Sequence, residues 1–205
     1  MDISVVDISS FCGLTALCVL TFNFLLGLML SSAYKRSVLW KKMPPFIKAT
    51  DIEMVHNRTA YIALFLVLVH PLLLLGDKTT KFRLVHILLP FNAPHQAVWV
   101  SLGVLSLYAV LIVIITTQKK IKSRLGFRAW KNLHLISYFT ALLMCIHGLF
   151  LDPELKDRQP DFLDGEKLLT ELCFIILISA SIVRYRYYLN ASDKKKTFEP
   201  KKSRA

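Results

Sequence analysis

The chain has 205 residues, of which 54% are hydrophobic, and it carries a formal net charge of +12. Its mean hydropathy of +0.48 is too high for an ordinary soluble domain and indicates that the bilayer is its main solvent. Because no nucleic-acid-binding motif accompanies the positive charge, we attribute that charge to membrane topology and to contact with anionic lipid rather than to nucleic acid.

Apolar stretches long enough to cross the hydrocarbon core, which takes about 20 helical residues, occur five times. They cover residues 9–33, 55–76, 97–118, 131–151 and 167–189. The sequence therefore predicts an all-α membrane protein, a bundle of five transmembrane helices. We expect one domain over residues 1–190 and a basic cytoplasmic tail over 191–205.

The first apolar stretch has no basic residues before it and is longer than the apolar part of a typical signal peptide, so we expect it to stay in the mature protein. All four cysteines lie within apolar stretches, and no pair has the C-x-x-C spacing of a zinc or redox site. They are Cys12, Cys18, Cys145 and Cys173. We interpret them as small core residues.

The distribution of Lys and Arg predicts the orientation of the bundle, because positively charged loops stay on the cytoplasmic side. Residues 34–58, residues 118–131 and the end after Ile182 together hold 20 of the 26 Lys and Arg. The N-terminus, with Asp2 and Asp7, is then outside, and the acidic loop 152–166 is also outside. The C-terminus is cytoplasmic.

Two of the predicted helices carry a pair of histidines each. His56 and His70 are 14 residues apart on the second helix, and His134 and His147 are 13 residues apart on the fourth. At about 1.5 Å of rise per residue, each pair spans roughly 20 Å of the bilayer. Since both helices run from inside to outside, His56 and His134 share the inner level, and His70 and His147 share the outer level.

This arrangement favours two stacked haems, each held by two imidazoles, which is ligation suited to electron transfer. No C-x-x-C-H motif is present, so the haems would be of b type. A single intramembrane histidine is as often a hydrogen-bonding or proton-relay residue. Four intramembrane histidines at matched depths on two helices favour haem ligation instead. On an ideal helix the 13-residue step leaves the second ring about 140° from the face of the first, so the fourth helix needs an adjustment: tilt, different imidazole rotamers or bending near Gly148.

Two segments resemble the ferric reductase-like transmembrane domain family, which includes NADPH oxidases, ferric reductases and the haem-binding membrane subunit of the bacterial methionine sulfoxide reductase system. One is His56-Asn57-Arg58-Thr59-Ala60 through Leu68-Val69-His70. The other is Trp130-Lys131-Asn132-Leu133-His134, then Tyr138, then Ile146-His147. The resemblance covers roughly residues 10–190 and implies an inner haem on His56 and His134 and an outer haem on His70 and His147.

The chain departs from this family in three respects. Members commonly have six helices, whereas this chain shows five and begins at what resembles the second. The histidine at position 56 brings it closer to the oxidases and ferric reductases than to the methionine sulfoxide reductase subunit. It also has no glycine-rich dinucleotide fingerprint, so we expect a cytoplasmic flavoprotein, or reduced flavin bound at the cytoplasmic face, to supply electrons.

Basic residues near the inner level are candidate partners of that donor and of the haem. Those of the 118–131 segment, which we expect to be a loop, could attract an acidic flavoprotein or a flavin phosphate, although orientation alone accounts for them. They are Lys119, Lys120, Lys122, Arg124 and Arg128. Arg58 and Arg128 are candidate partners of the inner haem propionates, beside Trp130. Lys81, Arg83 and His86 are candidates on the outer side.

The outer loops are too short for an elaborate substrate pocket, so we expect a small acceptor or a periplasmic redox partner. The acidic residues of the 152–166 loop could concentrate ferric ions, although a solvated loop is the simpler interpretation. Oxygen is another candidate acceptor.

We therefore expect a di-haem oxidoreductase component in the plasma membrane, with a bacterial inner membrane indicated by the short loops. Two alternatives stay open: a quinol-linked subunit of a periplasmic reductase, and a haem-free transporter that uses the histidines.

Overall fold

A computed structural model describes residues 4–32, 34–89, 91–152, 154–156, 158–159 and 161–198, and for residues 39 and 190–198 it describes the backbone alone. The described residues form helices and no strand. The long helices are α1 (Val5–Leu30), α4 (Ile52–Leu74), α6 (Ala97–Thr117), α7 (Lys119–His134), α8 (Ile136–Phe150) and α9 (Gly165–Phe198). Short helices α2 (Val38–Lys42), α3 (Pro45–Ala49) and α5 (Leu84–Leu88) and the 3-10 turn η1 (Tyr34–Arg36) lie in the connections.

Five segments in the described part of the chain are long and apolar enough to cross a membrane, as predicted. They are Val5–Leu30, Ile52–Leu74, Ala97–Thr117, Lys119–Phe150 and Gly165–Leu189. Polar residues fix where two of them begin. The Ser4 hydroxyl accepts a hydrogen bond from the Asp7 N–H and the Asp7 carboxylate accepts one from the Ser4 N–H, while the Asp51 carboxylate accepts from the N–H groups of Glu53 and Met54.

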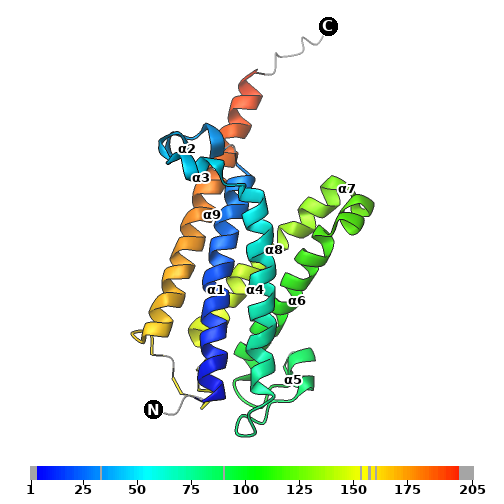
Figure 1. The fold of residues 1–205 in the computed structure, drawn as a ribbon, viewed down its shortest axis with the longest axis vertical. Coiled ribbons are helices and arrows are strands. Elements are labelled where there is room, and N and C mark those ends of the chain that lie inside the picture. The colour runs from blue at the N-terminus through cyan, green and yellow to red at the C-terminus, as the bar shows by residue number, and fades with distance from the viewer. Residues whose placement is uncertain are drawn as a thin grey trace.

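The helices pack in pairs along the chain's long axis. α1 lies against α4 on one side and α9 on the other, and α6 lies against α8, which also contacts α9 (Figure 1). The core lies where α1, α8 and α9 meet, around Leu17, Cys145, Cys173 and Leu177. The four cysteines are free thiols, and Cys145 and Cys173 are buried in this core.

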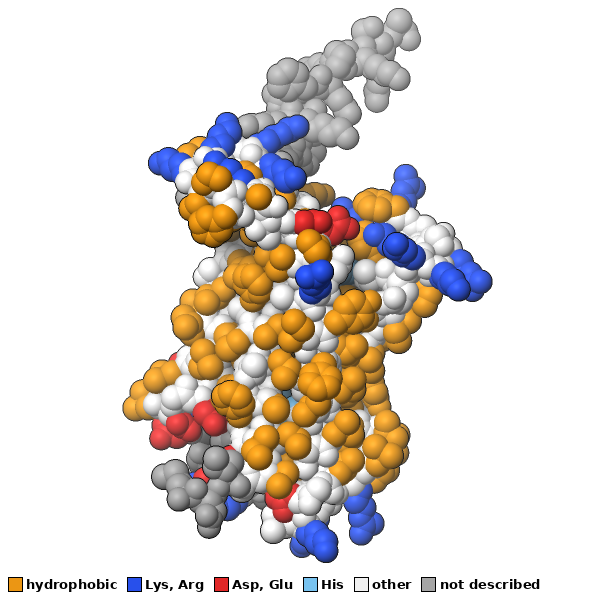
Figure 2. Space-filling model, viewed as in Figure 1, with side chains coloured by type: hydrophobic (Ala, Val, Ile, Leu, Met, Phe, Trp, Pro, Cys, Tyr) orange, Lys and Arg blue, Asp and Glu red, His pale blue; other side chains and the backbone are white. Residues whose placement is uncertain are grey.

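The outside of the bundle is apolar along its middle (Figure 2). Large side chains such as Phe11, Phe65, Ile175 and Val183 are exposed on it. Burying these side chains in lipid removes them from water, so the bundle is suited to a bilayer.

Basic side chains gather at the end formed by α2, α3 and α7, which we call the basic end (Figure 2). Its residues are Lys41, Lys42, Lys48, Lys119, Lys120, Lys122, Arg124 and Arg128. The predicted tail over 191–205 lies outside the described residues except for the backbone to Phe198, which continues α9.

The structure differs from prediction in the 118–131 segment, which is a helix and not a loop. α7 runs from Lys119 to His134 and changes direction at Gly126, whose backbone φ of 73° and ψ of 162° are not helical. Only a residue without a Cβ takes up such a conformation easily. The many charged residues of this segment predict a loop. Its apolar residues are nevertheless spaced between the charged ones as on an amphipathic helix that lies at a membrane surface.

Candidate functional site

The structure brings the four membrane histidines together as two pairs. His56 and His70 lie on α4, whereas His134 ends α7 and His147 lies on α8. The ring centroids of His56 and His134, the first pair, are 6.3 Å apart, and those of His70 and His147, the second pair, are also 6.3 Å apart. The pairing predicted from orientation and spacing is therefore the pairing in space.

The separation within each pair is that of two imidazoles on opposite sides of one metal ion. Two ring nitrogens that each bind a metal at about 2 Å place their ring centroids about 6 Å apart. The two rings are inclined at 67° in the first pair and at 78° in the second, and edge-to-face ring contacts span about 4.5–7 Å. The distance alone is thus compatible both with a ring contact and with two imidazoles that share a metal ion, and the hydrogen bonds of the rings decide between them.

Three of the four imidazoles have one ring nitrogen already bonded to a backbone carbonyl of a neighbouring helix. His70 Nδ1 lies 2.7 Å from Ser9 O, and His56 Nδ1 lies 3.1 Å from Asn23 O, both on α1. His147 Nδ1 lies 2.8 Å from Trp99 O on α6. Because a carbonyl only accepts, each Nδ1 carries the proton and each Nε2 keeps its lone pair for a metal.

A glycine makes room for each of these three rings, one helical turn after the carbonyl that accepts from it. A Cβ on Gly13 would lie 3.0 Å from His70 Nδ1, one on Gly27 would lie 3.3 Å from His56 Cε1, and one on Gly103 would lie 2.8 Å from His147 Cε1. Each unit of carbonyl and glycine is a cradle that holds one imidazole against a helix backbone. A residue larger than glycine would fill the space that the imidazole occupies.

His134 has no such cradle. Its Nδ1 is buried and has no hydrogen-bond partner. Its ring lies against that of Trp130, with centroids 5.3 Å apart, and the Lys122 ammonium lies 3.8 Å from the centroid of the Trp130 ring. The predicted site residue Trp130 therefore supports His134 from the side, in a cation–π stack.

Each histidine pair borders a cavity. The cavity at the first pair has a volume of about 830 Å³, within the range of roughly 300–1,000 Å³ typical of cofactor pockets. The cavity at the second pair is smaller, about 150 Å³, which is below this range. Leu17 and Met144 line both cavities and so form the partition between them.

The sequence profile described as "ferric reductase like transmembrane component" matches residues 12–145, more than half of the chain. The chain belongs to the ferric reductase-like transmembrane family. It is thus a transmembrane electron-transfer component, as the histidine-bearing segments predicted. The match includes His56, His70 and His134 and ends two residues before His147. No curated protein matches the chain.

In this ferric reductase-like bundle, two of the cations that line the first cavity, Lys119 and Lys120, are among those singled out from the sequence as partners of the donor, whereas Lys131 is not. Arg58 and Arg128 are exposed and are not among the lining residues. Lys131 was not chosen in advance, because it follows the change of direction of α7 at Gly126, which decides whether its side chain faces the cavity.

Sequence analysis missed Lys167, which is 4% exposed and lines the second cavity with Glu166. Its ammonium donates to Gly148 O at 2.8 Å and to Leu151 O, two carbonyls at the end of α8 beside His147. The available signal was a lysine at the start of an apolar stretch. His86, a predicted residue, also lines this cavity.

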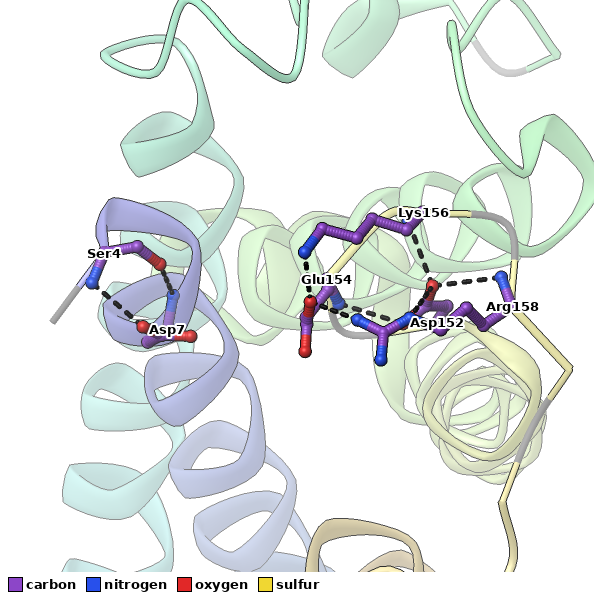
Figure 3. A network of polar contacts seen from close by, with 6 residues as sticks. All are labelled: Ser4, Asp7, Asp152, Glu154, Lys156 and Arg158. Atoms are coloured by element: carbon purple, nitrogen blue, oxygen red, sulfur yellow. Dashed lines mark hydrogen bonds and ion pairs between the residues drawn. The ribbon is translucent and has the colours of Figure 1, made fainter. Parts of the chain in front are cut away.

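Two carboxylates of the 152–166 loop, those of Asp152 and Glu154, have partners within the loop (Figure 3). Asp152 accepts hydrogen bonds from the N–H groups of Glu154, Lys156 and Arg158 at 3.1, 2.9 and 3.1 Å, while Glu154 is paired with the side chains of Lys156 and Arg158. Burial raises the pKa of Asp152, but these three donors and the Arg158 guanidinium outweigh it, so the pKa lies below its ordinary value. Among the described residues, no group of three or more acidic, His or Cys side chains is placed to hold a metal ion.

Proposed function

We propose that this protein is a di-haem electron conduit, with b-type haems held by the first and second histidine pairs. The observation that carries the proposal is the 6.3 Å separation of the ring centroids in both pairs, together with three Nδ1–H donors that leave Nε2 free. Haem would supply a one-electron carrier at each level. The residues around it orient the imidazoles and keep water out.

The partition between the cavities supports transfer from one level to the other. Leu17 and Met144 are the side chains common to both cavities. Leu17 is 5% exposed and belongs to the core cluster, against which Met144 packs. This apolar partition fixes the distance between the two sites and separates them from solvent.

The direction of transfer follows from the charges. Positively charged loops stay in the cytoplasm, so the basic end and the first cavity face inward and the second cavity faces outward. The lysines at the first cavity, Lys119, Lys120 and Lys131, favour an anionic donor, either an acidic flavoprotein or reduced flavin phosphate. Electrons then leave from the second cavity to a small external acceptor such as ferric ion or oxygen, or to a periplasmic redox partner. A bacterial inner membrane is the proposed location.

The test is to purify the protein in mild detergent and to measure haem against protein by the pyridine haemochrome spectrum. We expect two b-type haems per chain, falling to one in His70→Ala or His147→Ala. Retention of two haems in either variant would overturn the assignment of the second pair. A colourless protein after expression with added haem would instead favour a transporter that uses the histidines.

A further inference from the structure

We propose that His134 is the exchangeable one of the four histidines, and that a small neutral ligand of ferrous iron binds at the first site in its place. The proposal rests on the proposed function, because it requires haem at the first pair. It goes further by distinguishing one axial position from the other three. The distinction comes from the helix that faces His134.

α6 and α8 run antiparallel (Figure 1). The step from His147 to His134, toward lower residue numbers, therefore corresponds to a step toward higher residue numbers on α6. The cradle of His147 consists of Trp99 O and Gly103. A shift of 13 or 14 residues leads from Trp99 to Ile112 or Val113, and from Gly103 to Thr116 or Thr117. The place where a fourth cradle belongs therefore holds threonine, not glycine, in either register.

Both threonines also occupy the carbonyls that a fourth cradle would use. The Thr116 hydroxyl donates to Ile112 O at 2.7 Å and to Val113 O at 3.0 Å. The Thr117 hydroxyl donates to Val113 O at 2.7 Å. The carbonyls at this level are thus bonded within α6, which agrees with the lack of a partner for the buried His134 Nδ1.

Two further features set His134 apart. It is the last residue of α7, and the helical turn is tightened at the next residue, Leu135, whose N–H bonds to both Lys131 O and Asn132 O. Its cavity, about 830 Å³, is larger than the cavity of about 150 Å³ at the second pair. The ring of His134 therefore lies at the junction of two helices and beside the larger of the two cavities.

A hydrogen bond from the second ring nitrogen raises the basicity of a metal-bound imidazole and fixes its orientation, and losing it typically weakens metal binding about 10–100-fold. His134 lacks that bond, so its Nε2 is the weakest of the four donors. In the exchange, the lone pair of Nε2 leaves the iron and the lone pair of the incoming ligand replaces it. No electron is transferred and no proton is released.

Carbon monoxide is the probe. The full-length protein with two haems per chain is reduced with dithionite and titrated with carbon monoxide, and the difference spectrum is followed. We expect one equivalent to bind per chain. Binding of none, or of two equivalents with equal affinity, would overturn the proposal while leaving the two-haem function standing. A haem count of zero would overturn both.

The variant His134→Ala identifies the haem that responds. If the first haem is retained there, we expect one equivalent to bind more tightly than in the unaltered protein; if it is lost, we expect no carbon monoxide to bind. A second equivalent in the first case, or one remaining equivalent in the second, would mean that carbon monoxide binds at the second pair. Either result would overturn the proposal.

The double variant Thr116→Ala/Thr117→Gly rebuilds the missing cradle by freeing the carbonyls and opening space. We expect its affinity for carbon monoxide to fall by about tenfold or more. Thr15→Ala on α1 is the matched control, because it removes a hydroxyl that donates to a helix carbonyl, Phe11 O, at 2.8 Å and that does not line either cavity. Equal affinities in the double variant and the control would contradict the role assigned to the threonines.

Discussion

His56, His70 and His147 share a feature that a solvent-facing histidine would not need, a backbone carbonyl that accepts from the same ring nitrogen in all three. The feature depends on close approach between helices, because the ring must lie against the neighbouring backbone. Glycine is required at that point because the Cβ of any other residue would lie too close to the histidine ring. At the scale of single residues, therefore, the glycines of α1 and α6 are as much part of the site as the imidazoles.

Replacement of Gly103 tests this directly. In Gly103→Ala the new Cβ would lie 2.8 Å from His147 Cε1 and 2.9 Å from its Nδ1, so the ring must move away from its carbonyl. Overpacking of this kind costs about 1–3 kcal/mol. We expect haem to fall from two towards one per chain, as measured by the haemochrome spectrum. Gly165→Ala is the control, since a Cβ there meets no atom within 4 Å. An unchanged haem content in Gly103→Ala would contradict the cradle.

Asp152 should make the stability of the protein depend on pH. Its pKa is lowered on folding, so the stability it contributes is fully present above its unfolded pKa of about 4 and is lost as the pH falls through the lower folded pKa. Asp152→Asn removes the charge that the three N–H donors and Arg158 share. We expect a loss of about 1–3 kcal/mol at pH 7, measured by thermal unfolding in detergent, and a smaller difference at pH 3. The exposed Asp164→Asn should show neither effect.

Among the elements, the five membrane-crossing segments could be predicted because length and hydropathy are properties of each segment alone. The levels of the histidines followed from the same reasoning. The local geometry within the 13-residue step could not be predicted, since it includes a tightened turn between α7 and α8 at Leu135, where the N–H bonds to both Lys131 O and Asn132 O. The cradles were missed for a similar reason: Gly13 and Gly103 gain their meaning only from the helix opposite.

The end of α8 offers a prediction at this scale. Lys167 on α9 bonds to Gly148 O and Leu151 O and so holds the last turn of the helix that carries His147. Lys167→Met keeps the length of the side chain but removes the donor. We expect a loss of about 1–3 kcal/mol in stability and faster loss of one haem on dilution in detergent. Lys156→Met, at a side chain that is 67% exposed, serves as the control. Equal haem retention in both variants would show that Lys167 does not support the site.

Over the whole molecule, the arrangement of charge and the stacking of the two pairs define a route with two ends. Lys119, Lys120 and Lys131 line the cavity at one end, and Glu166 and Lys167 line the cavity at the other. The apolar surface between these ends places them on opposite sides of a bilayer (Figure 2). A protein built in this way should move electrons between compartments, and not only between molecules in one solution.

Proteoliposomes that enclose ferricyanide separate these two behaviours. Reduced flavin mononucleotide added outside reaches the basic end of those molecules inserted with that end outward, and we expect the enclosed ferricyanide to be reduced. His70→Ala interrupts the route at the second pair but leaves the first pair intact, so the remaining haem should still be reduced while transfer to ferricyanide falls by tenfold or more, since a gap of roughly 20 Å separates the levels. Vesicles without protein measure the leak of flavin. If His70→Ala transferred electrons as fast as the unaltered protein, the second pair would not lie on the route.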